Sequence, residues 1–191
     1  MNKHALIALS TTLLTATGIA HAQSATYTLE PTHTYVTFEA RHFGTSTNRG
    51  RFDKKEGSIT IDRAAKTGKA EITIDTASIN TGLALFDSLL RGENFLKTKE
   101  FPTAKFVGDK FTFEGDKVTA VSGTLTLLGK SQPVTLTATH YNCYDNPYLK
   151  REVCGGDFET TIQRTGYGMG YGVPAIPDDI KLVIQIEAVK Q

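Results

Sequence analysis

The sequence predicts an all-β protein, an eight-stranded antiparallel barrel with one crossover helix, and three observations support this fold class. From residue 23 onward, apolar and polar residues alternate with a period of two, which is typical of strands with one buried face. Turn signals such as Thr67-Gly68 and Leu128-Gly129-Lys130 separate the alternating runs. Only one segment has helical spacing instead. Eight meandering strands with a single crossover favour a closed barrel over a sandwich.

The first three strands are expected near residues 27–42, 50–62 and 69–76. Val36 and Phe38 are apolar positions of the first strand and are flanked by polar residues. Ile59 in the second strand and Ile72 and Ile74 in the third are likewise apolar residues flanked by polar ones. Each of these strands therefore presents one face to a core.

The crossover helix is expected between the third and fourth strands. Leu85 and Leu89 are four residues apart, as are Phe86 and Leu90, which is the spacing of neighbours on one helix face. Pro102 prevents a helix from continuing through it.

The remaining five strands are expected near residues 103–114, 117–128, 132–142, 157–165 and 179–189. In the strand at 117–128 the alternation changes phase between Ala120 and Val121, which indicates a β-bulge. Leu136 and Ala138 share one face of the next strand, and Ile184 is an inward position of the last. One domain, residues 23–191, accounts for all of these elements.

Composition excludes several classes of protein. Lys and Arg total 21 and Asp and Glu total 20, so the net charge of +1 offers no field for nucleic acid or an anionic bilayer. The G-x-S-x-G, H-E-x-x-H and strand–helix G-x-G-x-x-G motifs are absent from the sequence. The alternation puts His33 and His42 on opposite faces, which disfavours a histidine metal site. We therefore predict no catalytic residue, no cofactor and no metal.

The first 22 residues have the pattern of a secretory signal peptide. A short start with Lys3 precedes an apolar stretch that ends in Ala20-His21-Ala22, with small residues where signal peptidase cleaves. We expect cleavage after Ala22 and export to the periplasm. Beyond this segment no apolar run reaches the length of a membrane span, so we expect no stable membrane span in the mature chain.

Cys143 and Cys154 are the only two cysteines, eleven residues apart around a turn-like stretch. In an oxidising compartment such a pair is most simply a disulfide. A metal or redox site would call for a C-x-x-C motif or a nearby pair of histidines, and the sequence has neither.

Polar residues on the inward face are expected at one mouth of the barrel. If the strands run up and down in order, the first and seventh strands end at the same rim, which places His42 and Arg164 there. The 77–102 crossover, which carries Asp87, also covers this rim. His140 shares a face with Leu136 and is expected inside the opposite end. Arg164 either forms an ion pair with Asp87 or contacts a ligand, and His42 is either a core histidine or a ligand contact. The glycine-rich run at 166–172 is expected to form a flexible flap at the rim.

Several short stretches, in order along the whole mature chain, resemble the YceI-like family of secreted isoprenoid-binding proteins. Each stretch is weak alone, and their common order carries the resemblance. They are Tyr27…His33-Thr34, His42-Phe43-Gly44…Gly50-Arg51-Phe52, 77–81 (ASINT), Phe86-Asp87…Leu90-Arg91…Asn94-Phe95-Leu96, Phe101-Pro102…Phe106, 121–129 (VSGTLTLLG) and 164–168 (RTGYG).

The resemblance implies a lipocalin-like eight-stranded barrel that encloses a polyprenyl chain and has no catalytic activity. Two features depart from the family pattern. Leu89 stands where the family often has histidine, which affects the expected head-group contacts. The Cys143–Cys154 loop is also outside the common pattern, which suggests a feature of a subgroup at the far end of the barrel.

Together, the alternation and the resemblance predict a periplasmic carrier of a polyisoprenoid lipid, such as a quinone or its precursor, or of a similar long-chain amphiphile. The sequence leaves open whether the chain forms a homodimer. The predicted ligand-binding residues are Val36, Phe38, His42, Phe43, Phe52, Ile59, Ile72, Ile74, Asp87, Leu136, Ala138, Arg164 and Ile184.

Two alternatives stay open at this point. The chain could be an accessory module of a membrane electron-transfer protein, with the 166–172 flap as its contact surface. It could also be an enzyme acting on a lipid, in which His42 beside Asp87 is the one candidate acid–base pair.

Overall fold

Antiparallel pairing closes the sheet of this protein into a barrel. In the computed structural model, which describes residues 24–191, strand β1 (Ala25–Leu29) pairs with both β4 (Lys55–Asp62) and β11 (Asp179–Lys190). The pairing order around the wall is β1, β4, β5, β7, β8, β9, β10 and β11, which returns to β1. The predicted signal peptide, residues 1–22, lies outside the described residues.

The other elements follow the predicted order along the chain. They are β2 (Tyr35–His42), β3 (Ser46–Phe52), β5 (Thr67–Asp75), η1 (Thr76–Ser78), β6 (Ile79–Asn80), α1 (Ala84–Arg91), β7 (Thr103–Glu114), β8 (Lys117–Leu127), β9 (Lys130–Asn146), β10 (Arg151–Gln163) and η2 (Arg164–Tyr167).

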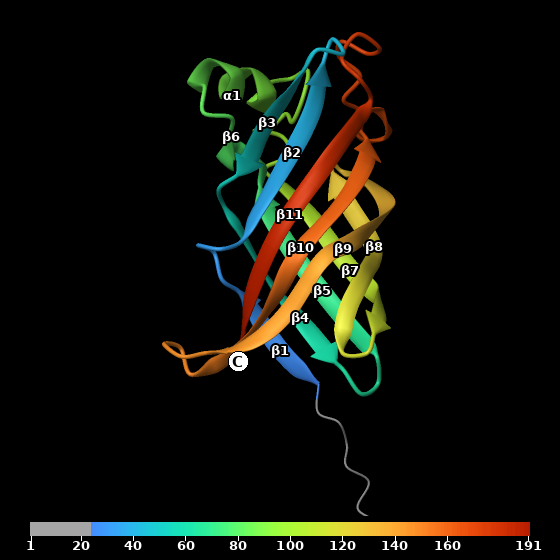
Figure 1. The fold of residues 1–191 in the computed structure, drawn as a ribbon. Helices are drawn as coiled ribbons and strands as arrows, with labels where there is room; N and C mark the ends of the chain where they lie inside the picture. The colour runs from blue at the N-terminus through green and yellow to red at the C-terminus, as the bar shows by residue number, and fades with distance from the viewer. Residues whose placement is uncertain (1–23) are drawn as a thin grey trace, which may run out of the picture.

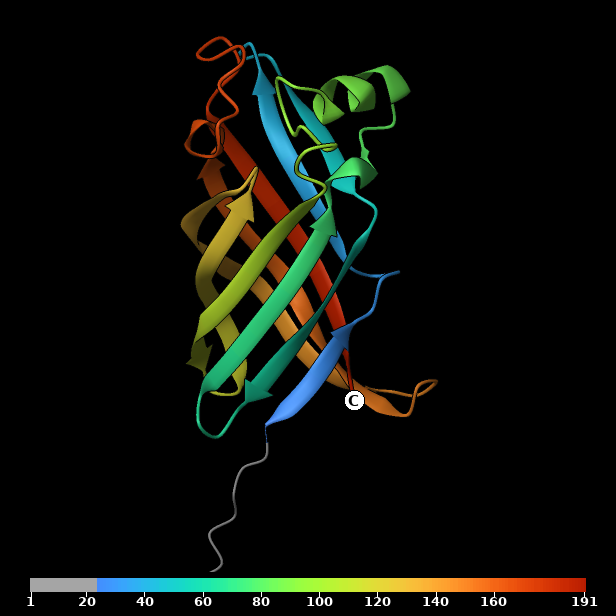
Figure 2. The ribbon, with the colours of Figure 1, turned by 180° about the vertical axis from the view of Figure 1, so that it is seen from behind.

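The two ends of the barrel differ. Helix α1, the turn between β2 and β3, and the loop that follows η2 lie at the end drawn uppermost in Figure 1, which we call the upper end. The β9–β10 hairpin, the β4–β5 turn and the β7–β8 turn lie at the lower end (Figures 1 and 2). Within residues 24–191, no helix is long and apolar enough to cross a membrane.

Two of the predicted strands are bent. The first, expected at 27–42, is interrupted at residues 30–34, where Pro31 lies in a turn, yet both of its halves pair with β11. The buried Thr34 hydroxyl donates to the Glu187 carbonyl and accepts from the Glu187 amide, which replaces the missing ladder bonds. The second breaks at Asp53 between β3 and β4. Counted as bent strands, β1–β2 and β3–β4 give the eight-stranded antiparallel barrel that the sequence predicts.

Three bulges change which residues face inward, and one of them, at Asp109 in β7, moves the inward positions from Phe106 and Gly108 to Phe111 and Phe113. Phe113 pairs with Val118 and Thr112 with Ala120, so Thr119 is the extra residue, close to the bulge predicted in β8. The sequence predicted neither the β7 bulge nor a further bulge in β9. Asp157 pairs with His140 while Phe158 pairs with Ala138, which leaves the intervening β9 residue unpaired and reverses the alternation beyond it. The prediction that His140 faces the interior is therefore wrong, because His140 is exposed.

The helical spacing of residues 85–90 places apolar residues on two faces of α1. Leu90 is buried and Phe86 is partly buried against the main hydrophobic core, which confirms one of the two predicted pairs as a core contact. Leu85 is exposed instead, and Leu89 is half exposed. The helix thus covers the upper end with one apolar face and leaves a second one uncovered.

Candidate functional site

The barrel holds a cavity of about 280 Å³ in its upper half. Nearly all of its wall is aliphatic or aromatic, and its polar side chains are Arg41, His42, Asn48 and Arg164. Six predicted ligand-binding residues line it: Val36, Phe38, His42, Phe52, Ile74 and Arg164.

A smaller cavity of about 60 Å³ lies farther down the barrel. Its wall is almost wholly apolar and includes four predicted ligand-binding residues, Ile59, Ile72, Leu136 and Ile184. Successive inward positions of one strand line the two cavities in turn: on β5, Ile74 lines the upper cavity and Ile72 the lower. The cavities are therefore stacked along the barrel axis.

Three predicted residues line neither cavity. Phe43 lies in the turn after β2, where its left-handed backbone (φ 47°) leaves the ring exposed. Ala138 packs against the main core without reaching either cavity. Asp87 is buried in α1 and faces a loop instead. That these three bind a ligand directly remains an untested prediction that the geometry does not support.

The sequence did not predict that α1 and its flanking loops supply much of the cavity wall. Phe86, Leu89 and Leu90 line the upper cavity, and the i, i+4 spacing was the signal that could have indicated this. Phe95, Leu96, Met169, Tyr171 and Ile176 also line it, from segments without regular periodicity.

Arg164 organises the segment that closes the upper end. Its side chain is 3% exposed, and its guanidinium donates four hydrogen bonds to main-chain carbonyls at 2.7–2.9 Å. The acceptors are Met169, Tyr171, Ile176 and Pro177. Burial lowers the pKa of this guanidinium below its ordinary value. Arg164 therefore ties the 169–177 loop to the end of β10, and its ion pair with Asp87, one of the two alternatives from the sequence, does not form.

Asp87 has a different partner. Its Oδ1 accepts hydrogen bonds from the Thr81 amide at 2.7 Å and the Thr81 hydroxyl at 2.6 Å. The Thr81 side-chain bond is the main reason that the pKa of Asp87 lies below its ordinary value. No hydrogen bond joins Asp87 to His42 in the described part of the chain, so the acid–base pair required by the enzyme alternative is not assembled.

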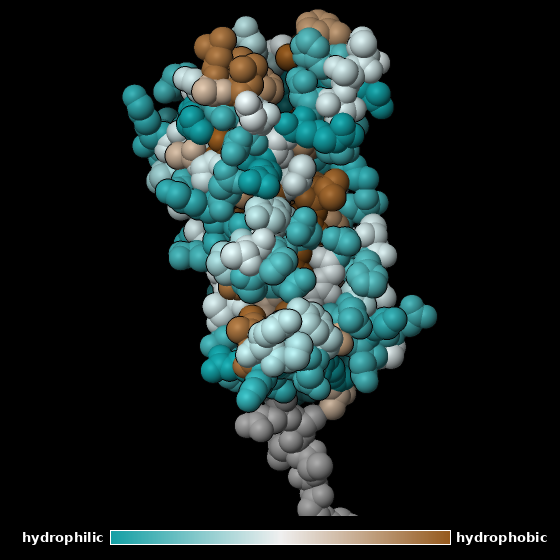
Figure 3. Space-filling model, turned by 60° about the vertical axis from the view of Figure 1, so that its left-hand side comes forward, coloured by the Kyte–Doolittle hydropathy of each residue, from teal (hydrophilic) through white to brown (hydrophobic). Residues whose placement is uncertain are grey.

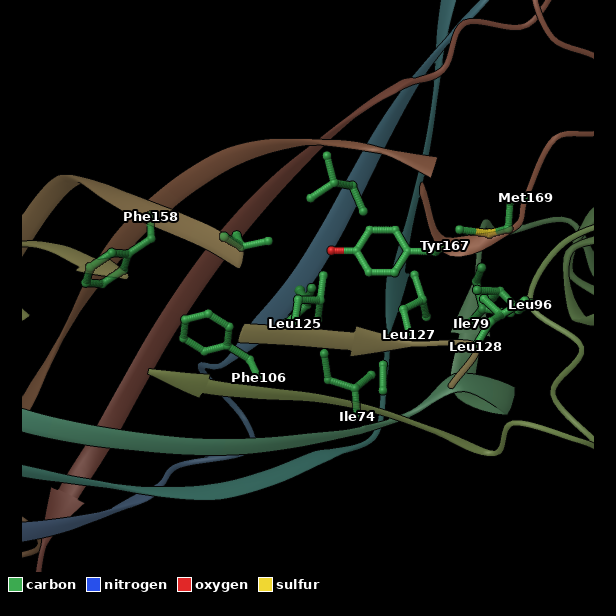
Figure 4. Close-up of a cluster of buried hydrophobic side chains, with 14 of the residues drawn as sticks. Ile74, Ile79, Leu96, Phe106, Leu125, Leu127, Leu128, Phe158, Tyr167 and Met169 are labelled. Atoms are coloured by element: carbon green, nitrogen blue, oxygen red, sulfur yellow. The ribbon is translucent and has the colours of Figure 1, made fainter. Parts of the chain in front are cut away.

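The Tyr167 hydroxyl has no hydrogen-bond partner within residues 24–191, although its side chain is 2% exposed. Burial raises the pKa of this phenol. Figure 4 shows the ring entering the core from η2, with its oxygen directed along the barrel past Leu125 toward Phe106 and Phe158. An unpaired buried hydroxyl is costly, about 1–3 kcal/mol, so this oxygen is a polar point in an otherwise apolar interior.

The predicted disulfide is confirmed at the lower end. Cys143 and Cys154 face each other across β9 and β10 and are bonded. Arg63 donates to both sulfurs, at 3.0 and 2.9 Å, and forms an ion pair with Glu152 at 3.1 Å. Burial raises the pKa of Glu152, but hydrogen bonds from Tyr27 and Arg63 bring it below its ordinary value.

The same cluster is the arrangement within residues 24–191 that comes nearest to a metal site. Potential ligand atoms of Cys143, Glu152 and Cys154 lie within 4.8 Å of one another. Cysteine binds metals as a thiolate, and here both sulfurs belong to the disulfide and lie beside the Arg63 cation. These residues do not fit a metal ion.

Comparisons with known proteins agree with this architecture. The model of the YceI-like domain matches residues 27–188. The chain is 31% identical to Protein YceI of Salmonella arizonae over 192 positions, an alignment that covers 100% of both chains.

Solved structures share the fold. A Campylobacter jejuni YCEI protein superimposes with a TM-score of 0.70 and 27% identity, over 78% of this chain and 89% of that one. A structure from Saccharophagus degradans, described as a polyisoprenoid binding domain implicated in plant cell wall breakdown, gives a TM-score of 0.59. That chain is 16% identical, and the match covers 86% of this chain and 98% of that one.

Proposed function

Because the chain belongs to the YceI-like domain family, we propose that it binds a polyisoprenoid lipid or a similar long-chain amphiphile, with the tail in the barrel. The observation that carries this proposal is the upper cavity, whose wall is apolar except at a few points. The Saccharophagus degradans domain, which shares the fold, supports the choice of an isoprenoid.

The physics of the cavity suits a branched hydrocarbon tail. Each buried CH₂ group contributes about 0.8 kcal/mol, so a tail gains affinity without directional contacts. Side chains such as Val36, Phe52 and Leu182 provide this surface. Arg41 and His42 lie at the mouth, where they can contact a polar head group.

Cavity size limits how much of a long tail fits in the upper half. Small-molecule sites commonly have about 300–1,000 Å³, and the upper cavity, at about 280 Å³, is slightly smaller. We propose that a longer tail continues toward the lower cavity or leaves between α1 and the 169–177 loop. The Tyr167 hydroxyl is directed toward Phe106 and Phe158, which line the lower cavity (Figure 4).

Native mass spectrometry of the purified protein tests the proposal. We expect a species heavier than the protein by one lipid, and lipid extraction should identify an isoprenoid. Delipidated protein should then bind geranylgeraniol, an isoprenoid alcohol, more tightly than octadecanol, its linear counterpart. Purified protein that carries no lipid and binds neither alcohol would contradict the proposal.

We also propose that the protein acts in the periplasm after removal of residues 1–22. The intact mass of the exported protein should equal that of a chain beginning at Gln23, less the two hydrogen atoms lost in the Cys143–Cys154 disulfide. Reduction under denaturing conditions should restore those two atoms and serves as the control. A mass that includes residues 1–22 would contradict the processing, and free thiols before reduction would contradict the oxidation.

A further inference from the structure

Large apolar side chains are exposed around the mouth of the upper cavity. They come from three segments: Phe43 in the β2–β3 turn, Leu83, Leu85 and Leu89 in and beside α1, and Tyr171 and Val173 in the loop after η2. We call these six residues the apolar rim. Figure 3, in which the α1 side comes forward, shows brown atoms gathered at the upper end, while teal and white atoms predominate at the lower end.

Five of the six rim residues lie in uncharged stretches of the chain, and the sixth, Leu89, lies between Asp87 and Arg91. Residues 42–48, 79–86 and 165–177 contain no Asp, Glu, Lys or Arg, although 21% of the whole chain is charged. Turns at the lower end are different: the β4–β5 turn contains Arg63 and Lys66, and the β7–β8 turn contains Asp116. The uncharged stretches therefore lie at the upper end, whose charged residues are concentrated in residues 87–100, in α1 and the loop that follows it.

The structure holds part of the rim in a fixed outward position. Arg91, at the end of α1, donates to the Ala77 and Ile79 carbonyls at 2.8 and 2.7 Å. Asp87, one turn earlier on the same face of the helix, accepts hydrogen bonds from Thr81. With both turns of this short helix tied to the preceding loop, Leu85 cannot fold inward without breaking these bonds, and it stays 79% exposed.

The rim is continuous with the cavity. Leu89 and Tyr171 line the upper cavity and are also exposed, so apolar surface runs without a break from the interior to the outside. Soluble monomers rarely expose large contiguous apolar patches, and those that exist commonly mark an interaction site.

We propose that the upper end of the barrel docks on a lipid bilayer, with the apolar rim inserted at the interface and the cavity mouth facing the lipid. Charged groups are costly to bring into a bilayer, which fits the uncharged stretches at 42–48, 79–86 and 165–177. Tyrosine is favoured at membrane interfaces, which fits Tyr171. The proposal rests on the proposed function, because a lipid can enter the cavity directly from the bilayer only if the cavity mouth faces the bilayer.

Vesicle flotation tests this docking. We expect the wild-type protein to float with phosphatidylcholine vesicles, and Leu85→Asp to weaken this binding by at least about tenfold, because the variant replaces a side chain inserted in the bilayer with a charged group. Tyr148→Asp is the matched control, because Tyr148 is 92% exposed at the lower end and should leave flotation unchanged. Flotation should also persist in high salt, because the proposed contact is made by apolar side chains and five of the six rim residues lie in uncharged stretches.

Leu85 does not line the cavity, so Leu85→Asp should keep the wild-type melting temperature and bound lipid. Loss of flotation with lipid retained separates docking from lipid binding. Wild-type protein that does not float, or equal flotation of Leu85→Asp, overturns the docking. Binding that requires anionic lipid and disappears in salt also overturns it. A dimer that Leu85→Asp dissociates, without wild-type flotation, would assign the rim to self-association instead.

Discussion

Replacing Arg164 by methionine should lower the free energy of unfolding by about 3 kcal/mol, which corresponds to a fall of roughly 6–12 °C in melting temperature for a chain of this size. The guanidinium donates four hydrogen bonds to carbonyls of the 169–177 loop, and each bond to a charged donor contributes about 1.5–3 kcal/mol. The loss is smaller than their sum because methionine also removes a buried cation whose desolvation is unfavourable. Thermal melts of ligand-free protein measure the effect.

Asp87→Ala is the control for this prediction. Asp87 contacts Thr81 and not Arg164, so its removal should reduce stability clearly less than Arg164→Met does. Because the pKa of Asp87 is lowered in the native state, its contribution is present above the ordinary carboxyl pKa and disappears as the pH falls through the lowered value. If Asp87→Ala proved as damaging as Arg164→Met, the loop-anchoring role of Arg164 would be wrong.

The sequence predicted the barrel well because a period of two is a direct consequence of strand geometry. It placed His42 and Arg164 at one mouth and the disulfide loop at the other, as the structure has them. It failed for His140 because one unpaired residue in β9 reverses every later position, and no residue type marks that bulge. A bulge of this kind depends on pairing with β10, which a single-sequence pattern does not contain.

The candidate site was less predictable than the fold. Charge complementarity suggested that Arg164 pairs with Asp87, but the carbonyls of its own loop satisfy the guanidinium. Phe95 and Met169 reach the cavity from irregular segments, where no periodicity indicates which side faces inward. A filled core and a hollow barrel both have apolar residues at the inward positions of each strand. The alternation therefore could not predict the cavity, which only the structure shows.

Replacing Ala104 by phenylalanine should remove most of the bound lipid and leave the ligand-free fold nearly intact. Ala104 is buried on β7, pairs with Ile74 on β5 and lines the upper cavity. The added ring would enter space that the protein does not fill, so it competes with the lipid tail and not with packed side chains. Native mass spectrometry gives the lipid occupancy, and a thermal melt of delipidated protein gives the stability.

Val107→Phe on the same strand is the matched control, because Val107 faces outward and should alter neither lipid occupancy nor the melting temperature. Overpacking a filled core costs about 1–3 kcal/mol, and the Ala104 variant should avoid that penalty because a cavity of about 280 Å³ adjoins the side chain. If Ala104→Phe lost that much stability and kept its lipid, the ligand would lie elsewhere. Reduced occupancy at unchanged stability is the combination that a filled core cannot produce, because there the ring has no space to occupy without displacing neighbours.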